Sequence, residues 1–478
     1  MTPDEFRAHG HALVDWIADY RAGLRDRPVA PPTRPGEVRA LLPEEPPRRP
    51  EPFAACLADL DRVVARNILH FQHPAFFGFF PANAELAGVL ADLASTGLGV
   101  VGLSWAASPA LSEVEEVALD WMRRMLGLSQ EWRGVIQDTA STATLVALLC
   151  AREKASGHAQ TRGGMQDVGF QEGGAPSIVY ASAAAHSSVE KAALLAGFGR
   201  AHYRAIPLDG NQAMRPDALE AAIAADRAAG LRPAAIVACV GGTATASLDP
   251  LADVARIARA RGLWLHVDAA MAGSAMILPE CRWMWEGIED ADSLVVNAHK
   301  WLGAPFDCSL YYVRDEAHLT RVMSTNPSYL QTSVDGQVRN LRDTGIPLGR
   351  RFRALKLWWL IREQGVEGLQ ARLRRDLANA AWLAKQAQAT PGWRVLAPVH
   401  LQTVCLRHAP PGLAGEALDA HTRGWCEAIN RSGRAYLTPA ILDGRWMVRV
   451  SIGALGTERA DVEALWALMR ETAEKANG

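Results

Sequence analysis

The central part of the chain alternates short apolar runs with helical segments, and this alternation limits the folds that the chain can adopt. Four runs are clear: SIVYAS at 177–182, AIVACV at 235–240, LWLHVD at 263–268 and SLVVN at 293–297. Between the second and third runs lies the helical sequence LADVARIARARG, for which Asp249 and Pro250 are the expected N-cap and first residue and Gly262 the expected end. This is a βαβ unit, so residues from about 135 to 315 are predicted to form a mostly parallel sheet with helices on both faces.

The two ends of the chain follow different patterns. Residues 4–24 predict an amphipathic helix with an apolar stripe, and the nine prolines from Pro28 to Pro52 predict an extended arm without regular helix or central strand. A helix on such an arm favours a partner subunit, although it could also fold back on its own chain. After residue 358, a helix, the strands VCLRH and WMVRVSI, and a last helix opened by Thr457 predict a separate α+β lobe.

Composition excludes several classes of protein. Fifty Lys and Arg residues against 52 Asp and Glu residues provide no broad cationic field, so we expect no nucleic-acid partner. The seven scattered cysteines contain no CxxC pair, which argues against a disulfide framework and a zinc site and favours the cytoplasm. The uncharged stretch 93–112 contains three glycines and Pro109, so we interpret it as buried backbone and expect no membrane partner.

Reactive side chains follow the apolar runs, where an open parallel sheet binds its ligands. These side chains are His186 after the first run, Thr243 after the second, Asp268 at the end of the third, and Asn297, His299 and Lys300 at the end of the fourth. The segment DTASTATLVALLCARE also places Thr139, Ser141 and Thr142 at a helix start, which suits a phosphate. A phosphate site, an amine, a flat imidazole and a carboxylate that keeps a ring nitrogen protonated together predict pyridoxal 5'-phosphate (PLP) as the cofactor.

Five longer motifs resemble a known family: GLSWAASPALSEVEE at 102–116, AHSSVEKA at 185–192, HVDAA at 266–270, NAHKW at 297–301 and IPLGRRFRALKLW at 346–358. They are similar to the PLP-dependent aromatic-L-amino-acid decarboxylases, of the group that includes glutamate and histidine decarboxylases, and most of all to bacterial L-DOPA decarboxylases. This resemblance implies the aspartate-aminotransferase fold, type I of the PLP enzymes, in a homodimer with its active site at the subunit interface. We expect a dimerisation segment at 1–82, a PLP-binding domain at 83–357 and a small domain at 358–478.

The resemblance also implies roles for individual residues. Lys300 matches the lysine that forms the Schiff base, Asp268 the partner of the pyridine nitrogen, and His186 the imidazole stacked on the ring. Thr243 matches a threonine that contacts the cofactor; the residues expected around the phosphate are Ala140, Ser141 and Asn297, with Thr139 and His299 beside them. The expected contacts to an aromatic substrate are Phe79, Phe80, Ala82, Leu103, Trp105 and Met271.

The implied reaction converts an aromatic L-amino acid (DOPA, tryptophan, tyrosine, 5-hydroxytryptophan or phenylalanine) to its amine and carbon dioxide. The sequence departs from the family at Leu341, where animal and plant members place a tyrosine that donates a proton to Cα. Tyr329, His186 or water would replace this donor, and formation of an aromatic aldehyde is the main alternative. A transaminase is a third possibility. A non-catalytic regulator is poorly supported, because Lys300 is present and no basic helix-turn-helix precedes the core.

Overall fold

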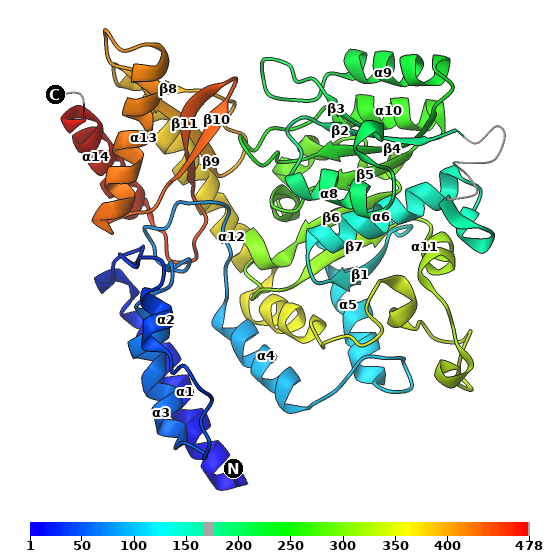
Figure 1. The fold of residues 1–478 in the computed structure, drawn as a ribbon, viewed down its shortest axis with the longest axis horizontal. Coiled ribbons are helices and arrows are strands. Elements are labelled where there is room, and N and C mark those ends of the chain that lie inside the picture. The colour runs from blue at the N-terminus through cyan, green and yellow to red at the C-terminus, as the bar shows by residue number, and fades with distance from the viewer. Residues whose placement is uncertain (166–174, 477–478) are drawn as a thin grey trace. The chain divides into compact units, whose positions relative to one another are not determined.

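The computed structural model describes residues 1–165 and 175–476, and the chain divides into two compact units (Figure 1). The large unit consists of Ala82–Leu377 and Ala397–Thr403, and the small unit of Met1–Pro81, Ala378–Leu396 and Val404–Gly478. Residues of the long helix α12 (Ala354–Ala389) belong to both units.

A seven-stranded sheet forms the core of the large unit. Its strands, in the order in which they pair, are β1 (Arg133–Gln137), β7 (Ser309–Val313), β6 (Ser293–Asn297), β5 (Trp264–Asp268), β4 (Arg232–Cys239), β2 (Ser177–Ser182) and β3 (Tyr203–Ile206). Only β7 runs antiparallel to its neighbours. The four apolar runs are β2, β4, β5 and β6, which confirms the predicted, mostly parallel sheet.

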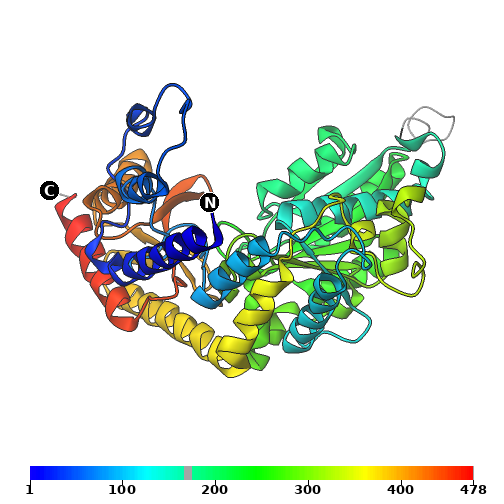
Figure 2. The ribbon, with the colours of Figure 1, turned by 90° about the horizontal axis from the view of Figure 1, so that it is seen from below.

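Helices cover this sheet, as Figures 1 and 2 show. The described α-helices of the large unit, besides its part of α12, are α4 (Leu86–Gly97), α5 (Pro109–Met125), α6 (Ala140–Ala155), α8 (Ser187–Leu195), α9 (Pro216–Ala228), α10 (Leu251–Arg261) and α11 (Glu316–Met323). Helix α6 packs across β1 and β4 to β7, because its apolar residues from Ala143 to Ala151 are largely buried.

The predicted βαβ unit is present, but one of its caps differs. Gly262 ends α10 in the left-handed conformation, with φ of 68°, as predicted. Asp249 was expected to be the N-cap, and this expectation is wrong, because Pro250 occupies that position. The carboxylate of Asp249 instead accepts hydrogen bonds from the N–H groups of Cys239 and Met214. It therefore ties the end of β4 to a neighbouring loop.

The small unit contains a four-stranded sheet and two helices that pack together. The strands pair in the order β10 (Thr438–Leu442), β11 (Arg445–Ser451), β9 (Thr403–His408) and β8 (Trp393–Val395), and the helices are α13 (Gly415–Ser432) and α14 (Arg459–Lys475). Thr457 does not open α14 as predicted. Glu458 is the N-cap and forms a capping box with Asp461, whereas the Thr457 hydroxyl donates to the carbonyl of Pro74.

The N-terminal part of the small unit begins with α1 (Pro3–Ala22), which packs against α3 (Phe53–Asp59). The predicted apolar stripe is only partly covered: the Tyr20 hydroxyl bonds to His70, but Phe6 is 59% exposed. The proline-rich arm was expected to lack helix, yet α2 (Glu37–Leu41) forms within it. This short helix lies between Pro35 and Pro43, where no proline interrupts the backbone.

Helix α4 corrects the expectation that residues 93–112 are buried. Leu90, Leu93 and Leu98 are exposed, and Leu98 has 69% of its surface accessible. Leu90 and Leu93 lie on this helix, and Leu98 is its C-cap; Gly88 and Ala91 of the same helix are buried. Among the described residues, the helices are too short or too polar to cross a membrane.

Candidate active site

The carboxyl ends of β1, β4, β5 and β6 and the amino end of β7 lie along one edge of the large sheet, which we call the carboxyl edge. Cys239 of β4 pairs with Asp268 of β5, and Asn297 of β6 pairs with Ser309 of β7. Ser309 also pairs with Gln137, the last residue of β1. Because β7 runs in the opposite direction, it contributes its first residue to the edge where its neighbours contribute their last.

The charge of Asp268 influences the pKa of His186 near this edge. The carboxylate of Asp268 accepts a hydrogen bond of 3.0 Å from the N–H of Ala270, which fixes its orientation. Desolvation lowers the pKa of His186 below its ordinary value, Asp268 opposes this shift, and Lys300 adds to it. The three side chains predicted to do the chemistry therefore lie within electrostatic range of one another.

His186 also caps helix α8. Its Nδ1 accepts a hydrogen bond of 3.1 Å from the N–H of Ser188 and lies 2.7 Å from the Ser188 hydroxyl. A ring nitrogen that accepts from an amide carries no proton, so the neutral ring holds its proton on Nε2. His186 thus presents a neutral imidazole with an N–H donor.

Lys300 lies in η8 (Ala298–Leu302), a single irregular turn that follows β6. Its neighbours His299 and Trp301 are buried, and the Trp301 indole donates a hydrogen bond of 2.9 Å to Asp376. Burial, together with the charge of Lys300, lowers the pKa of His299 to about 4. The turn is therefore held rigidly on both sides of the lysine.

Asn297 precedes this turn and is fully engaged in the sheet. Its Oδ1 accepts a hydrogen bond of 2.6 Å from the Ser309 hydroxyl, and its N–H donates to the carbonyl of Ala270. Among residues 1–165 and 175–476, no hydrogen bond engages its Nδ2, which can therefore donate to a ligand. The Nδ1 of His299 accepts a hydrogen bond from the N–H of Cys308, which ties the turn to the segment before β7.

The start of helix α6 offers N–H donors at the end of β1. The N-cap is Thr139, whose hydroxyl accepts from the N–H of Thr142. The N–H groups of Ala140 and Ser141, in the first turn, have no intrahelical acceptor. Such N–H groups and the helix dipole favour an anion.

Thr243 follows two glycines after β4. Gly241 has φ of 91°, and a Cβ on Gly242 would lie 2.6 Å from the Ser247 hydroxyl, so neither position accommodates another residue without rearrangement. The N–H of Thr243 points to the carbonyl of Ala184 at 3.4 Å. Thr243 is therefore placed beside the loop that carries His186.

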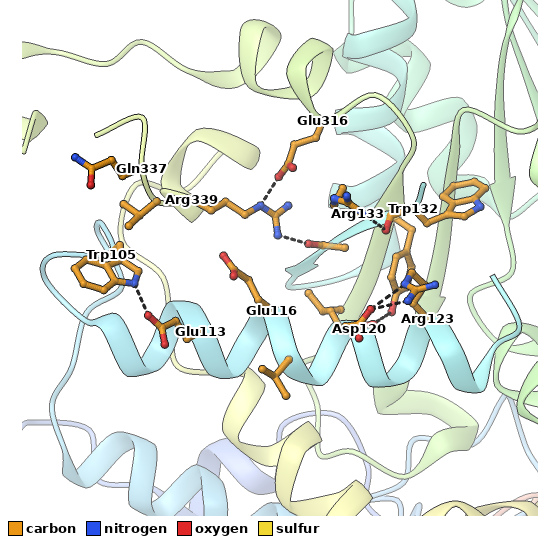
Figure 3. Close-up of a pocket in the computed structure, with 15 residues that line it drawn as sticks. Trp105, Glu113, Glu116, Asp120, Arg123, Trp132, Arg133, Glu316, Gln337 and Arg339 are labelled. Atoms are coloured by element: carbon orange, nitrogen blue, oxygen red, sulfur yellow. Dashed lines mark hydrogen bonds and ion pairs between the residues drawn. The ribbon is translucent and has the colours of Figure 1, made fainter. Parts of the chain in front are cut away.

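The predicted substrate contacts belong to both units. In the large unit, Met271 is buried, Ala82 and Leu103 are half-buried, and Trp105 donates from its backbone to the Asn340 side chain and from its indole to Glu113. Figure 3 shows this indole at the end of a cavity along α5. In the small unit, the exposed ring of Phe79 lies among Phe71, Phe76 and Tyr436.

Arg449 of β11 is a candidate that sequence reasoning missed. Its guanidinium lies 4.8 Å from the centre of the Phe80 ring, and the whole residue is 5% exposed. Its Nε and Nη2 have no hydrogen-bond partner among the described residues. A buried cation with unpaired donors is suited to bind an anionic group. A single arginine within the apolar strand WMVRVSI was the available signal.

The residues of the carboxyl edge fit PLP. They provide an amine for its aldehyde, a carboxylate for its ring nitrogen, a neutral imidazole, and a helix start with two N–H groups for its phosphate. Gly241 and Gly242, which precede Thr243, have no side chains in this part of the edge. A Cβ at either position would collide with Ala272 or Ser247.

Comparisons with known proteins identify relatives along nearly the whole chain. The pattern of the pyridoxal-dependent decarboxylase conserved domain matches residues 35–409. The phenylacetaldehyde synthase of Arabidopsis thaliana is 37% identical, covering 99% of this chain and 96% of that protein, and the aromatic-L-amino-acid decarboxylase of Bos taurus is 40% identical, covering 99% and 97%. The crystal structure of Oryza sativa TDC with PLP and tryptamine has a TM-score of 0.95 at 35% identity, with 99% of each chain covered.

Proposed function

The chain belongs to the pyridoxal-dependent decarboxylase family, and from this premise we propose how its residues act on an aromatic L-amino acid. The enzyme is a PLP-dependent carboxy-lyase that forms the amine and carbon dioxide. When bound, PLP supplies an electron sink for the bond that breaks at Cα. The observation that carries our proposal is the position of three side chains along the carboxyl edge: Asp268 at the end of β5, Lys300 in the turn after β6 and His186 after β2.

These three residues have separate roles in the proposal. Lys300 would hold the cofactor through its Nζ amine. Asp268 would keep a proton on the ring nitrogen, because an anion in contact with a cation favours the protonated form. Its carboxylate is already oriented by the N–H of Ala270, so it needs no rearrangement to do so.

The phosphate would bind at the start of α6. The N–H groups of Ala140 and Ser141 would donate to it, and the Thr139 hydroxyl and the Asn297 amide would support it. Thr243 would contact the cofactor from the segment after β4, beside the loop that carries His186, and His299 would hold the Lys300 turn in place.

His186 would return a proton to Cα from Nε2. Its hydrogen bonds to Ser188 occupy Nδ1, so Nε2 is the atom that can donate. Tyr329 is the competing donor within the chain, and it is 78% exposed on the short helix η9 (Ser328–Leu330). Water is the third candidate.

The substrate ring would contact the apolar residues that the sequence singled out, except Trp105, whose indole lines the separate cavity along α5. These residues are Phe79, Phe80, Ala82, Leu103 and Met271. These side chains offer apolar and aromatic surface, which suits the ring of DOPA, tryptophan, tyrosine, 5-hydroxytryptophan or phenylalanine. Truncation of one of these side chains, as in Met271→Ala, is expected to alter the order of preference among these amino acids.

Aldehyde formation is the second candidate function, and Leu341 favours it. This residue begins η10 (Leu341–Thr344), is 3% exposed and carries no proton donor. The phenylacetaldehyde synthase among the relatives makes this outcome chemically reasonable. Incubating the holoenzyme in air with each aromatic amino acid, while measuring carbon dioxide, amine, aldehyde and peroxide, tests both. Oxygen uptake equal to substrate consumption, with little amine, would overturn the decarboxylase assignment.

A homodimer with the active site at the subunit interface is also part of the proposal. Its support is the exposed apolar surface of α4, with Leu90, Leu93 and Leu98, and of α1, with Phe6. Light scattering after size-exclusion chromatography measures the mass directly. A stable, active monomer would contradict the dimer.

We place the enzyme in the cytoplasm. All seven cysteines are free, and Cys56 is exposed, which suits a compartment that keeps thiols reduced. Subcellular fractionation of the source cells with an activity assay is the test, and activity confined to a membrane or secreted fraction would contradict it.

A further inference from the structure

A cavity of about 640 Å³ lies between helix α5, strand β1 and residues 337–339 (Figure 3). Its volume falls within the range of roughly 300–1,000 Å³ typical of small-molecule sites. Lys300, Asp268 and His186 are not among its lining residues. The chemistry of this cavity therefore has to be explained by its own side chains.

Glu116 supplies a carboxylate that lacks a partner. It projects from α5 toward Arg339 in Figure 3, is half-buried, and forms no hydrogen bond or ion pair with the described residues. Desolvation raises its pKa, and the positive charge of Arg339 opposes that shift. Glu113, one turn earlier, already accepts from the Trp105 indole.

Arg339 supplies a donor that also lacks a partner. Its Nη1 donates to the carbonyl of Gly134 at 2.6 Å, and its Nε forms an ion pair with Glu316. Its Nη2 is buried and has no hydrogen-bond partner among the described residues. A buried donor is normally satisfied, so the unpaired Nη2 of Arg339, with the half-buried carboxylate of Glu116 in the same cavity, points to a ligand that carries a complement to each charge.

We propose that this cavity is a second, non-catalytic site for a free α-amino acid with an aromatic side chain. The ammonium group of the ligand pairs with Glu116, its carboxylate accepts from Nη2 of Arg339, and its ring packs against Trp105. An amine would leave Arg339 unsatisfied, and a carboxylic acid would leave Glu116 unsatisfied. The ligand class follows from the cavity, but the supply of such a ligand rests on the proposed function, which makes aromatic amino acids the substrates.

Calorimetric titration of borohydride-reduced holoenzyme with L-tryptophan tests the site without turnover. We expect one saturable site per chain. Tryptamine, which lacks the carboxylate, and indole-3-propionate, which lacks the ammonium group, are each expected to bind about tenfold or more weakly, since each loses a charge-assisted hydrogen bond. Amine formation by the unreduced enzyme is measured separately, so failure of the proposed function and failure of this site give different results.

The decisive variant is Glu116→Gln, which preserves shape and removes the charge. It is expected to weaken L-tryptophan binding by about tenfold or more, because the ammonium group loses its counter-charge. Glu367→Gln, an exposed carboxylate of α12 outside this cavity, is the matched control and should bind as the parent does. The proposal is overturned if the parent shows no saturable binding, if Glu116→Gln binds equally well, or if tryptamine or indole-3-propionate binds as tightly as L-tryptophan.

Discussion

Replacing Glu115 by Gln is expected to be among the most destabilising isosteric changes in the large unit. Glu115 Oε1 accepts from the N–H of Ile136 at 2.8 Å, and both of its oxygens accept from Arg350 at 2.7 and 3.1 Å. The side chain of Glu115 is fully buried and that of Arg350 is 7% exposed. Glutamine has only one acceptor oxygen and no charge, so it would leave the guanidinium buried without a counter-ion.

The magnitude follows from this loss. Breaking a buried ion pair by removing one partner typically costs about 3–5 kcal/mol, because the remaining charge keeps its desolvation penalty. A typical free energy of unfolding is about 5–15 kcal/mol, so the change should be large. The effect should extend to the loop before α5, since the N–H of Gly102 donates to the carbonyl of Arg350.

Urea unfolding of the holoenzyme at fixed cofactor and protein concentration measures the difference. Glu113→Gln is the control on the same helix, because Glu113 is exposed, and it should cost less than about 1 kcal/mol. The double variant Glu115→Gln, Arg350→Met should recover part of the loss, since an apolar side chain needs no counter-charge. A single variant within 1 kcal/mol of the parent, or a double variant that loses the sum of both changes, would refute this reasoning.

Four further outcomes are expected. Borohydride reduction and peptide mass mapping should place the pyridoxyl group on Lys300, and a tag on another lysine would contradict its role. Asp268→Asn should lower kcat about 10- to 1,000-fold while the fold is retained, because a contacting anion shifts a pKa by about one to three units; near-normal amine formation would count against the role of the carboxylate. Leu341→Tyr should lower the ratio of aldehyde to amine formed in air, and an unchanged ratio would exclude this position from proton return. Stability should fall as pH drops from 6.5 toward 4, because burial lowers the pKa of both His266 and His299 to about 4 while the unfolded chain binds protons near 6.5; urea midpoints that stay constant over this range would show that these rings are accessible.

The sheet and the order of its reactive residues could be predicted because each depends on local pattern. SIVYAS and SLVVN match β2 and β6 residue for residue, since every position in these strands is buried and, apart from Asn297, is a small, apolar or aromatic residue. The topology of a parallel sheet then brings Asp268 and Lys300 to the same edge as His186. The cofactor could be predicted from the chemical types of these three residues, a carboxylate, an amine and an imidazole, without knowledge of the distances between them.

Other features depend on partners that are remote in the sequence. Asp249 and Thr457 have good capping side chains, but each finds a tertiary partner, at Cys239 and Pro74 respectively, that competes with the cap. The sequence around Arg449 contains no pattern that distinguishes a buried guanidinium from an exposed one. The surface of α4 could not be predicted as exposed because apolar composition alone does not say whether the same chain covers it.

Because His186 caps α8, a variant at this position can lose activity either through a less stable helix or through a slower reaction. An alanine substitution would remove the proposed proton donor and, in the same step, the acceptor for the N–H of Ser188, so it would confound a local loss of helix with a slower reaction. Asparagine is the informative replacement. It is a favoured N-cap residue whose side-chain oxygen can accept from that N–H, yet it cannot act as an acid or base near neutral pH. In the proposed mechanism one side chain serves both as helix cap and as proton donor, so a replacement donor at this position must also preserve the cap of α8.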